Sequence, residues 1–120
     1  MKHLIRIVFV LISLLISACE TEGLKQVGFN SAIQKNSHGL TILYVNSESS
    51  ILVLKGNIEL TQGEVCVELE NPENEIVFSK TINSTDIVAI HESFQSHKGY
   101  WKLRYKSIDG DGNITLHLSN

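Results

Sequence analysis

From Gly39 to the C-terminus, apolar and polar residues alternate with a period of two, which is the pattern of half-buried β-strands. Around Cys66, for example, Val65, Val67 and Leu69 alternate with polar neighbours. Segments of this kind lie at residues 40–45, 52–60, 65–69, 76–82, 87–91, 101–106 and 114–118. This part of the sequence has no apolar repeat with helical spacing. Seven short strands predict an all-β fold, an antiparallel β-sandwich in which each sheet buries one face.

The first eighteen residues have a different pattern. Lys2 and Arg6 precede an apolar segment of about ten residues, interrupted only by Ser13, which is the length of a signal-peptide core. The run is too short to cross a bilayer of roughly 30 Å as a helix. It also lacks the polar face that a buried helix of a folded domain would show. Residues 1–18 are therefore predicted to be a signal peptide.

The motif Ile16-Ser17-Ala18-Cys19 at the end of this segment resembles the lipobox of bacterial lipoproteins. The resemblance implies cleavage before Cys19 and a diacylglyceryl group on its thiol, with a further acyl chain on its amine in many members. Two acyl chains would hold the protein firmly on a membrane. An ordinary secretory signal cut after Ala18 is the alternative.

Glu20, not Asp, follows this cysteine, and in Gram-negative lipoproteins that choice favours the outer membrane. The expected location is the bacterial cell envelope, with the chain facing the periplasm or the exterior.

Residues 20–38 are mostly polar and show no sustained periodicity, which predicts a flexible tether. A docked first strand from Phe29 to Ile33 is the alternative. The expected organisation is a signal peptide at 1–18, a lipidated cysteine and tether at 19–38, and the sandwich at 39–120. Residues 99–103, followed by a glycine-rich turn and a final strand, resemble the C-terminal hairpin of Ig-like or jelly-roll accessory domains.

One strand is predicted to show an aromatic ring and three cations on its outer face: Tyr100, Lys102, Arg104 and Lys106. On an otherwise acidic protein, this row would suit an anionic partner such as a glycan, a lipid headgroup or an acidic protein. The alternative is a charged surface that keeps the protein soluble and blocks sheet-to-sheet aggregation. No longer basic stretch is present, which argues against nucleic acid as a partner.

Asp109, Asp111 and Asn113 place oxygen-bearing side chains at alternate positions, as calcium loops do. The rest of the EF-hand pattern fails, because Ile114 and Asn120 stand where glycine and glutamate are needed. A tight hairpin turn is the main interpretation, since Asp, Gly and Asn all tolerate positive φ. Weak calcium binding is the alternative.

The histidines and the second cysteine give no reactive site. His91 and His97 flank a probable loop, but a metal site needs three or four converging ligands, so surface histidines are expected. Ser93 and Ser96 lie near them without an orienting acid, and no catalytic motif is present. Cys66 is the single cysteine of the domain, and we expect it to be buried in a central strand.

These features predict a lipid-anchored, non-enzymatic binding or accessory domain of the bacterial cell envelope without a cofactor. Its partners would be the membrane, through the lipid, and another envelope protein or a glycan. A structural subunit that joins an assembly through an edge strand is an alternative. A small metal-binding protein or enzyme that uses His91 and His97 is another.

Overall fold

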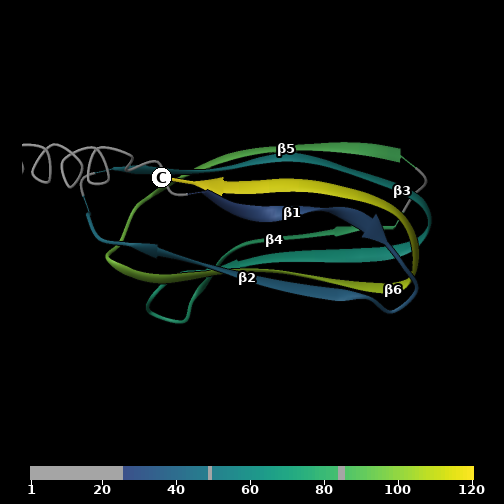
Figure 1. Ribbon diagram of the computed structural model, residues 1–120, viewed down its shortest axis with the longest axis horizontal. Helices are drawn as coiled ribbons and strands as arrows, with labels where there is room; N and C mark the ends of the chain where they lie inside the picture. The colour runs from purple at the N-terminus through teal and green to yellow at the C-terminus, as the bar shows by residue number, and fades with distance from the viewer. Residues whose placement is uncertain (1–25, 49, 84–85) are drawn as a thin grey trace, which may run out of the picture.

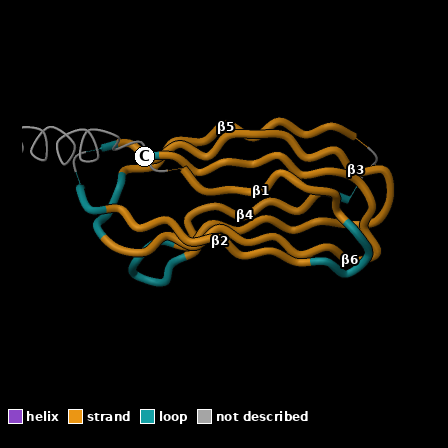
Figure 2. Tube along the Cα trace, viewed as in Figure 1, coloured by secondary structure: helices purple, strands orange, loops and turns teal. Residues whose placement is uncertain are grey.

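The computed structural model describes residues 26–48, 50–83 and 86–120 (Figure 1). Within these ranges the chain forms six strands: β1 (Gln26–Ile33), β2 (His38–Val45), β3 (Ile51–Glu70), β4 (Ile76–Ile82), β5 (Asp86–Gln95) and β6 (Gly99–Ser119). All the strand pairs are antiparallel, so the predicted all-β antiparallel class is confirmed (Figure 2). The same ranges hold no helix that is long and apolar enough to cross a membrane.

β3 and β6 are unusually long, at 20 and 21 residues, and they pair with each other along most of their length. Their register shifts between Leu60 and Glu64, where β3 faces the segment 108–111 of β6. Gly63 (φ 79°) and Asp109 (φ 50°) adopt left-handed backbone conformations at this level. Irregularities of this kind bend a strand and increase its twist. Both long strands therefore bend side by side, and the sheet folds back on itself.

Folding at these bends gives two layers that face each other (Figure 1). In the first layer, β1, the second half of β6, the first half of β3 and β5 are neighbours in that order. In the second layer, the order is β2, the first half of β6, the second half of β3 and β4. β3 runs from the first layer into the second, and β6 runs from the second layer into the first.

The core lies between the layers and follows the period of two. In β6, Trp101 and Leu103 are buried, while Lys102 and Arg104, which alternate with them, are partly exposed. The fully buried side chains include Ile33, Leu52, Leu54, Ile58, Val65, Val67, Leu69, Trp101, Leu103, Ile114, Leu116 and Leu118. Each large apolar side chain buried in this way contributes about 1.5–3 kcal/mol of transfer free energy. The alternation in the sequence thus determines which face of each strand is inside.

The tether prediction is wrong over residues 26–33, which form β1. Val27 and Phe29 pack against the core, and Ile33 is completely buried. The ring of Phe29 meets the ring of Tyr105 edge-on, with centroids 4.8 Å apart. The alternative, a docked strand from Phe29 to Ile33, lies within β1 and rests on alternating apolar residues in a short segment. Cys19, the signal segment and residues 20–25 lie outside the described residues.

The prediction of seven separate strands is also wrong. The segments 52–60 and 65–69 are two halves of β3, and 101–106 and 114–118 are two halves of β6. Residues 109–113 consequently form no hairpin turn, and the described chain does not end in the hairpin that its resemblance to Ig-like domains implied. The glycine-rich segment bends the strand instead of reversing it, because its partner is the equally bent β3.

Candidate functional site

One surface of the molecule combines exposed apolar, aromatic and charged side chains, and we call it the β2–β6 face. It is the outer side of the second layer. Its residues point outward because they alternate with the buried residues of the same strands. They are His38, Leu40, Ile42 and Tyr44 of β2, Tyr100, Lys102, Arg104 and Lys106 of β6, and Cys66, Glu68 and Glu70 of β3.

The predicted binding residues of β6 lie in one row on this face, with Glu68 and Glu70 of β3 beside them. The Lys102 Nζ is 3.8 Å from an Oε2 of Glu70, and the Arg104 guanidinium lies 3.5 Å from the same oxygen. Arg104 also lies 3.9 Å from Glu68. Such half-exposed pairs contribute at most about 1 kcal/mol each, but they balance much of the positive charge. The row is therefore not the open cationic surface that the sequence suggested.

An apolar and aromatic row runs beside the charged one. Leu40 and Ile42 are 57 % and 46 % exposed, which is high for aliphatic residues in regular strands. Tyr44 is the cross-strand partner of Tyr100, and their ring centroids are 4.9 Å apart with an interplanar angle of 55°. Sequence analysis singled out Tyr100 but missed its neighbours on β2. The signal was present, because the outward positions of the segment 40–45 are all apolar or aromatic.

Two hollows lie along the same face. One, of about 590 Å³, is lined by Ile42, Pro72, Asn74, Lys98, Gly99, Tyr100 and Lys102. The other, of about 560 Å³, is lined by His38, Gly39, Leu40, Cys66, Glu68, Arg104, Tyr105 and Lys106. We call them the Tyr100 hollow and the Cys66 hollow. Both volumes lie in the range of small-molecule sites. Cys66 is half-buried on the outer face, so its predicted burial inside a central strand is wrong.

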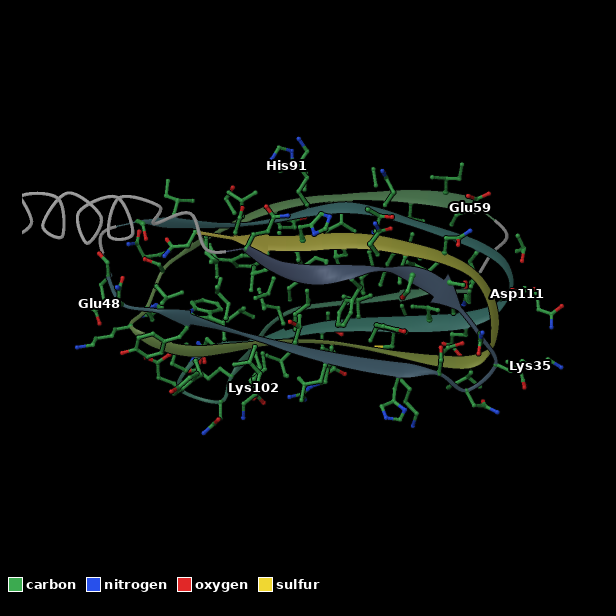
Figure 3. The ribbon with its side chains drawn as sticks, viewed as in Figure 1. Lys35, Glu48, Glu59, His91, Lys102 and Asp111 are labelled. Atoms are coloured by element: carbon green, nitrogen blue, oxygen red, sulfur yellow. The ribbon has the colours of Figure 1, made fainter. Side chains whose placement is uncertain are left out.

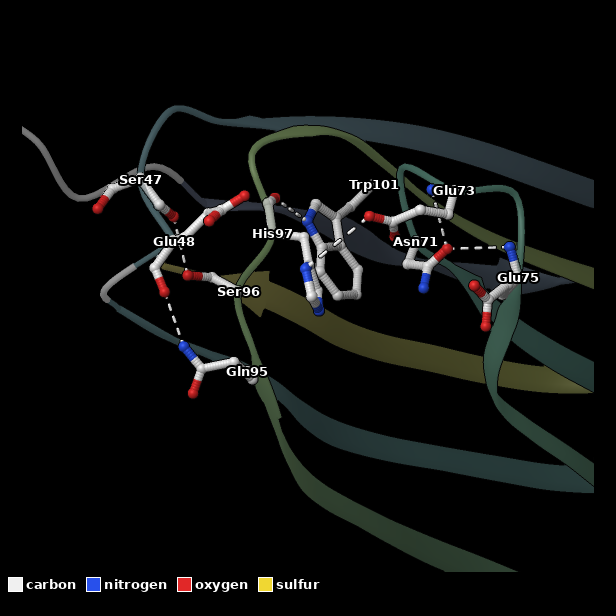
Figure 4. A network of polar contacts seen from close by, with 9 residues as sticks. All are labelled: Ser47, Glu48, Asn71, Glu73, Glu75, Gln95, Ser96, His97 and Trp101. Atoms are coloured by element: carbon white, nitrogen blue, oxygen red, sulfur yellow. Dashed lines mark hydrogen bonds and ion pairs between the residues drawn. The ribbon is translucent and has the colours of Figure 1, made fainter.

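Polar contacts fix the two loops that lie next to the Tyr100 hollow (Figure 4). Asn71, which is 7 % exposed, accepts hydrogen bonds on its Oδ1 from the backbone N–H groups of Glu73 (3.0 Å) and Glu75 (2.9 Å). The Trp101 Nε1–H donates to the carbonyl oxygen of His97 over 2.9 Å. These bonds satisfy buried polar groups and fix the β3–β4 turn and the β5–β6 loop.

The remaining predicted ligands are separated. His91 projects from the first layer, on the side of the molecule opposite Lys102 (Figure 3). His97 instead stacks against Trp101, with ring centroids 6.3 Å apart. No group of three or more metal-binding side chains of the types His, Cys, Asp and Glu occurs in residues 26–48, 50–83 and 86–120. Metal binding by these histidines stays a prediction.

Asp109, Asp111 and Asn113 lie in and beside the bend of β6, where all three are exposed. Asp111 pairs with Gln62 in the ladder, and Asn113 pairs with Glu59. The alternate spacing of their oxygen atoms thus belongs to a bent strand and not to a loop. Calcium binding by these residues stays a prediction.

No family model matches this chain, and no curated protein matches it by sequence. Among solved structures, it is similar to part of the insecticidal delta-endotoxin Cry8Ea1 from Bacillus thuringiensis. That match has a TM-score of 0.50 and 10 % identity, and it covers 76 % of this chain and 19 % of the toxin. Part of dimeric latent PorU from Porphyromonas gingivalis matches with a TM-score of 0.51 and 8 % identity, over 76 % of this chain and 10 % of PorU.

A third similar structure is the CBM36-1 domain of a multidomain xylanase from the hindgut metagenome of Trinervitermes trinervoides. Its TM-score is 0.49 at 10 % identity, over 82 % of this chain and 91 % of that domain. The chain spans only a fifth or less of the endotoxin and of PorU. At these identities, the matches to the endotoxin and to PorU show a shared all-β fold and nothing about activity.

Proposed function

We propose that this chain is a lipid-anchored, non-enzymatic binding domain of the bacterial cell envelope. In this proposal the two layers form a β-sandwich, Cys19 carries the lipid, and the β2–β6 face binds an envelope partner. The lipobox Ile16-Ser17-Ala18-Cys19 supports the anchor. The two facing layers with the core between them support the sandwich.

A single observation carries the choice of surface: both hollows and the row of exposed apolar residues lie on the same face. The middle of the opposite outer face is polar, with Lys55, Asn57 and Thr115. Exposed apolar side chains gathered beside concave surface, with polar residues around them, are typical of interaction sites. From His38 to Tyr44 the face extends for about 20 Å, because a strand rises by about 3.3 Å per residue. It is long enough for an extended partner.

The test is crosslinking in cells of the full-length protein, followed by identification of what co-purifies. We expect Leu40→Thr/Ile42→Thr to lose the partner, because threonine keeps the strand but removes apolar contact area. Ile87→Thr is the matched control, since Ile87 is 63 % exposed on β5 of the other layer. Capture that is unaffected by the double variant would contradict the binding surface. Membrane partitioning that is unaffected by Cys19→Ala would contradict the anchor.

A second candidate is a structural subunit that adds a partner strand to the edge of β2. The edge strands β4 and β5 each carry an inward-pointing charge, Lys80 opposite Val67 and Glu92 opposite Leu54. Charges of this kind block strand addition. The inward positions of β2 hold only Gly39, Thr41, Leu43 and Val45. Thr41→Lys would block strand addition at the edge of β2 without changing the β2–β6 face. It should therefore abolish partner capture only under the second candidate.

A further inference from the structure

We infer that the Tyr100 hollow binds an acidic glycan, a saccharide chain that carries carboxylate groups. This inference rests on the proposed function, because the hollow is part of the β2–β6 face. It is argued from the chemistry of the lining, which combines an aromatic wall, an apolar floor, an amide and two ammonium groups.

The aromatic wall is the ring of Tyr100, which is 61 % exposed. A pyranose ring has one face made largely of C–H groups, and such a face packs well on an aromatic ring. The contact with the ring of Tyr44, with centroids 4.9 Å apart, holds Tyr100 from the side of β2. A tyrosine that is already held loses little conformational entropy when a ligand binds. Ile42 and Pro72 add apolar surface next to this ring.

The polar part of the lining determines the class of saccharide. Asn74 offers an amide, which can both donate to and accept from sugar hydroxyl groups. The two charged side chains of the lining, Lys98 and Lys102, are both cationic. Lys102 has only part of a counter-ion, because the Glu70 oxygen that lies 3.8 Å from it is also 3.5 Å from Arg104. Two ammonium groups beside an aromatic ring favour sugars that carry carboxylates over neutral sugars.

The backbone next to the hollow brings its lining residues together. Gly99 has φ 133°, a conformation that L-residues with side chains rarely adopt. Its position brings the start of β6 against Pro72 of the β3–β4 turn, so that Lys98 and Tyr100 stand next to Asn74. Asn71 fixes the same turn by accepting its two backbone hydrogen bonds. The backbone that carries the groups expected to contact the saccharide is therefore fixed before it binds.

The test is affinity electrophoresis of the full-length protein, purified in non-ionic detergent, through gels that contain a soluble polysaccharide. The acidic probes are alginate, polygalacturonate and hyaluronate, and the neutral probe is dextran. We expect retardation by at least one acidic polymer, little retardation by dextran, and weaker retardation at about 0.5 M salt, because salt screens the lysine contacts. Tyr100→Ala should weaken binding by about tenfold, whereas Tyr100→Phe should retain it.

A matched pair of charge variants tests the ammonium groups. Lys98→Gln/Lys102→Gln should reduce binding to the acidic polymer by about tenfold or more, while Lys55→Gln, on the opposite outer face, should leave it unchanged. Melting temperatures of all variants show whether a loss reflects unfolding. The Tyr100→Phe and lysine variants remove no buried group, so they keep the inference testable if Tyr100→Ala does not fold.

Three outcomes would overturn the inference. The first is no retardation by any acidic polymer, and the second is equal retardation by dextran. The third is retardation that survives both Tyr100→Ala and the double lysine variant. If one of these occurs while Leu40→Thr/Ile42→Thr still abolishes partner capture in cells, the glycan is wrong but the proposed function stands. If capture also survives that double variant, both fail.

Discussion

A Cβ atom added to Gly99 would lie only 2.7 Å from the Cβ of Pro72, so β6 begins in direct contact with the β3–β4 turn. Gly99 reaches this position with φ 133°. The contact joins two loops that are far apart in the sequence, and it places Tyr100 at the edge of its hollow. One glycine thus connects the fold to the candidate site.

The first prediction is that Gly99→Ala destabilises the protein. Alanine meets both the unfavourable φ and the ring of Pro72, so we expect the free energy of unfolding to fall by about 1–3 kcal/mol. Urea denaturation followed by tryptophan fluorescence would measure the change, since Trp101 is buried two residues away. Lys98→Ala is the control and should stay within about 0.5 kcal/mol of the parent. Equal stability of the two variants would show that the turn adapts to a larger residue.

The second prediction concerns Asn71, whose Oδ1 accepts hydrogen bonds from the N–H groups of Glu73 and Glu75. Asn71→Ala should lower the free energy of unfolding by about 1–3 kcal/mol, because two part-buried donors lose their acceptor. Asn71→Asp retains the acceptor oxygens and should be affected less. The same denaturation measurement applies to both variants. A larger loss for the aspartate than for the alanine would contradict this account.

Local patterns were sufficient to locate most of the strands. The segment 76–82 was predicted with the bounds that β4 has, and 40–45 lies inside β2. The alternation also identified the buried face, as Leu103 and Leu69 illustrate, which are both fully buried and paired with each other. Such patterns report only which side of a strand meets the core.

The continuity of β3 and β6 could not be predicted in this way. Gly63 and the segment 109–112 have the composition of turns, and residues of this kind serve both in hairpins and in strand bends. The choice depends on a long-range pairing, in which Gln62 of β3 lies opposite Asp111 of β6. Local sequence patterns do not determine this long-range register.

Only part of the candidate site was predicted, because the rest of it also depends on which strands pair. The outward row that begins at Tyr100 follows from the alternation within one strand. Its ion pairs with Glu68 and Glu70, and its contact with Tyr44, depend on which strands are neighbours. The electrostatic character of the face therefore depends on β3 and β2, which lie on either side of β6.

The third prediction is that Lys80 prevents edge-to-edge association. Its side chain stands opposite Val67, on the core side of the edge strand β4, where a charge cannot be covered by another strand without loss of hydration. We expect Lys80→Val to increase self-association, measured by sedimentation velocity, without lowering the melting temperature. Lys80→Arg keeps the charge and should remain as monodisperse as the parent. Identical sedimentation of Lys80→Val and the parent would show that this edge is protected by other means.

The fourth prediction concerns the thiol of Cys66. It lies half-buried on the β2–β6 face, lines the Cys66 hollow and is 3.8 Å from an Oε1 of Glu68. In the full-length Cys19→Ala variant, where Cys66 is the only thiol, a thiol reagent should modify the folded protein without denaturant. The rate should be lower than in urea, because part of the side chain is covered. Replacing Leu40, which lines the same hollow, by alanine should increase the rate by uncovering the thiol. Modification that begins only above the unfolding midpoint would show instead that the Cys66 hollow is closed in solution.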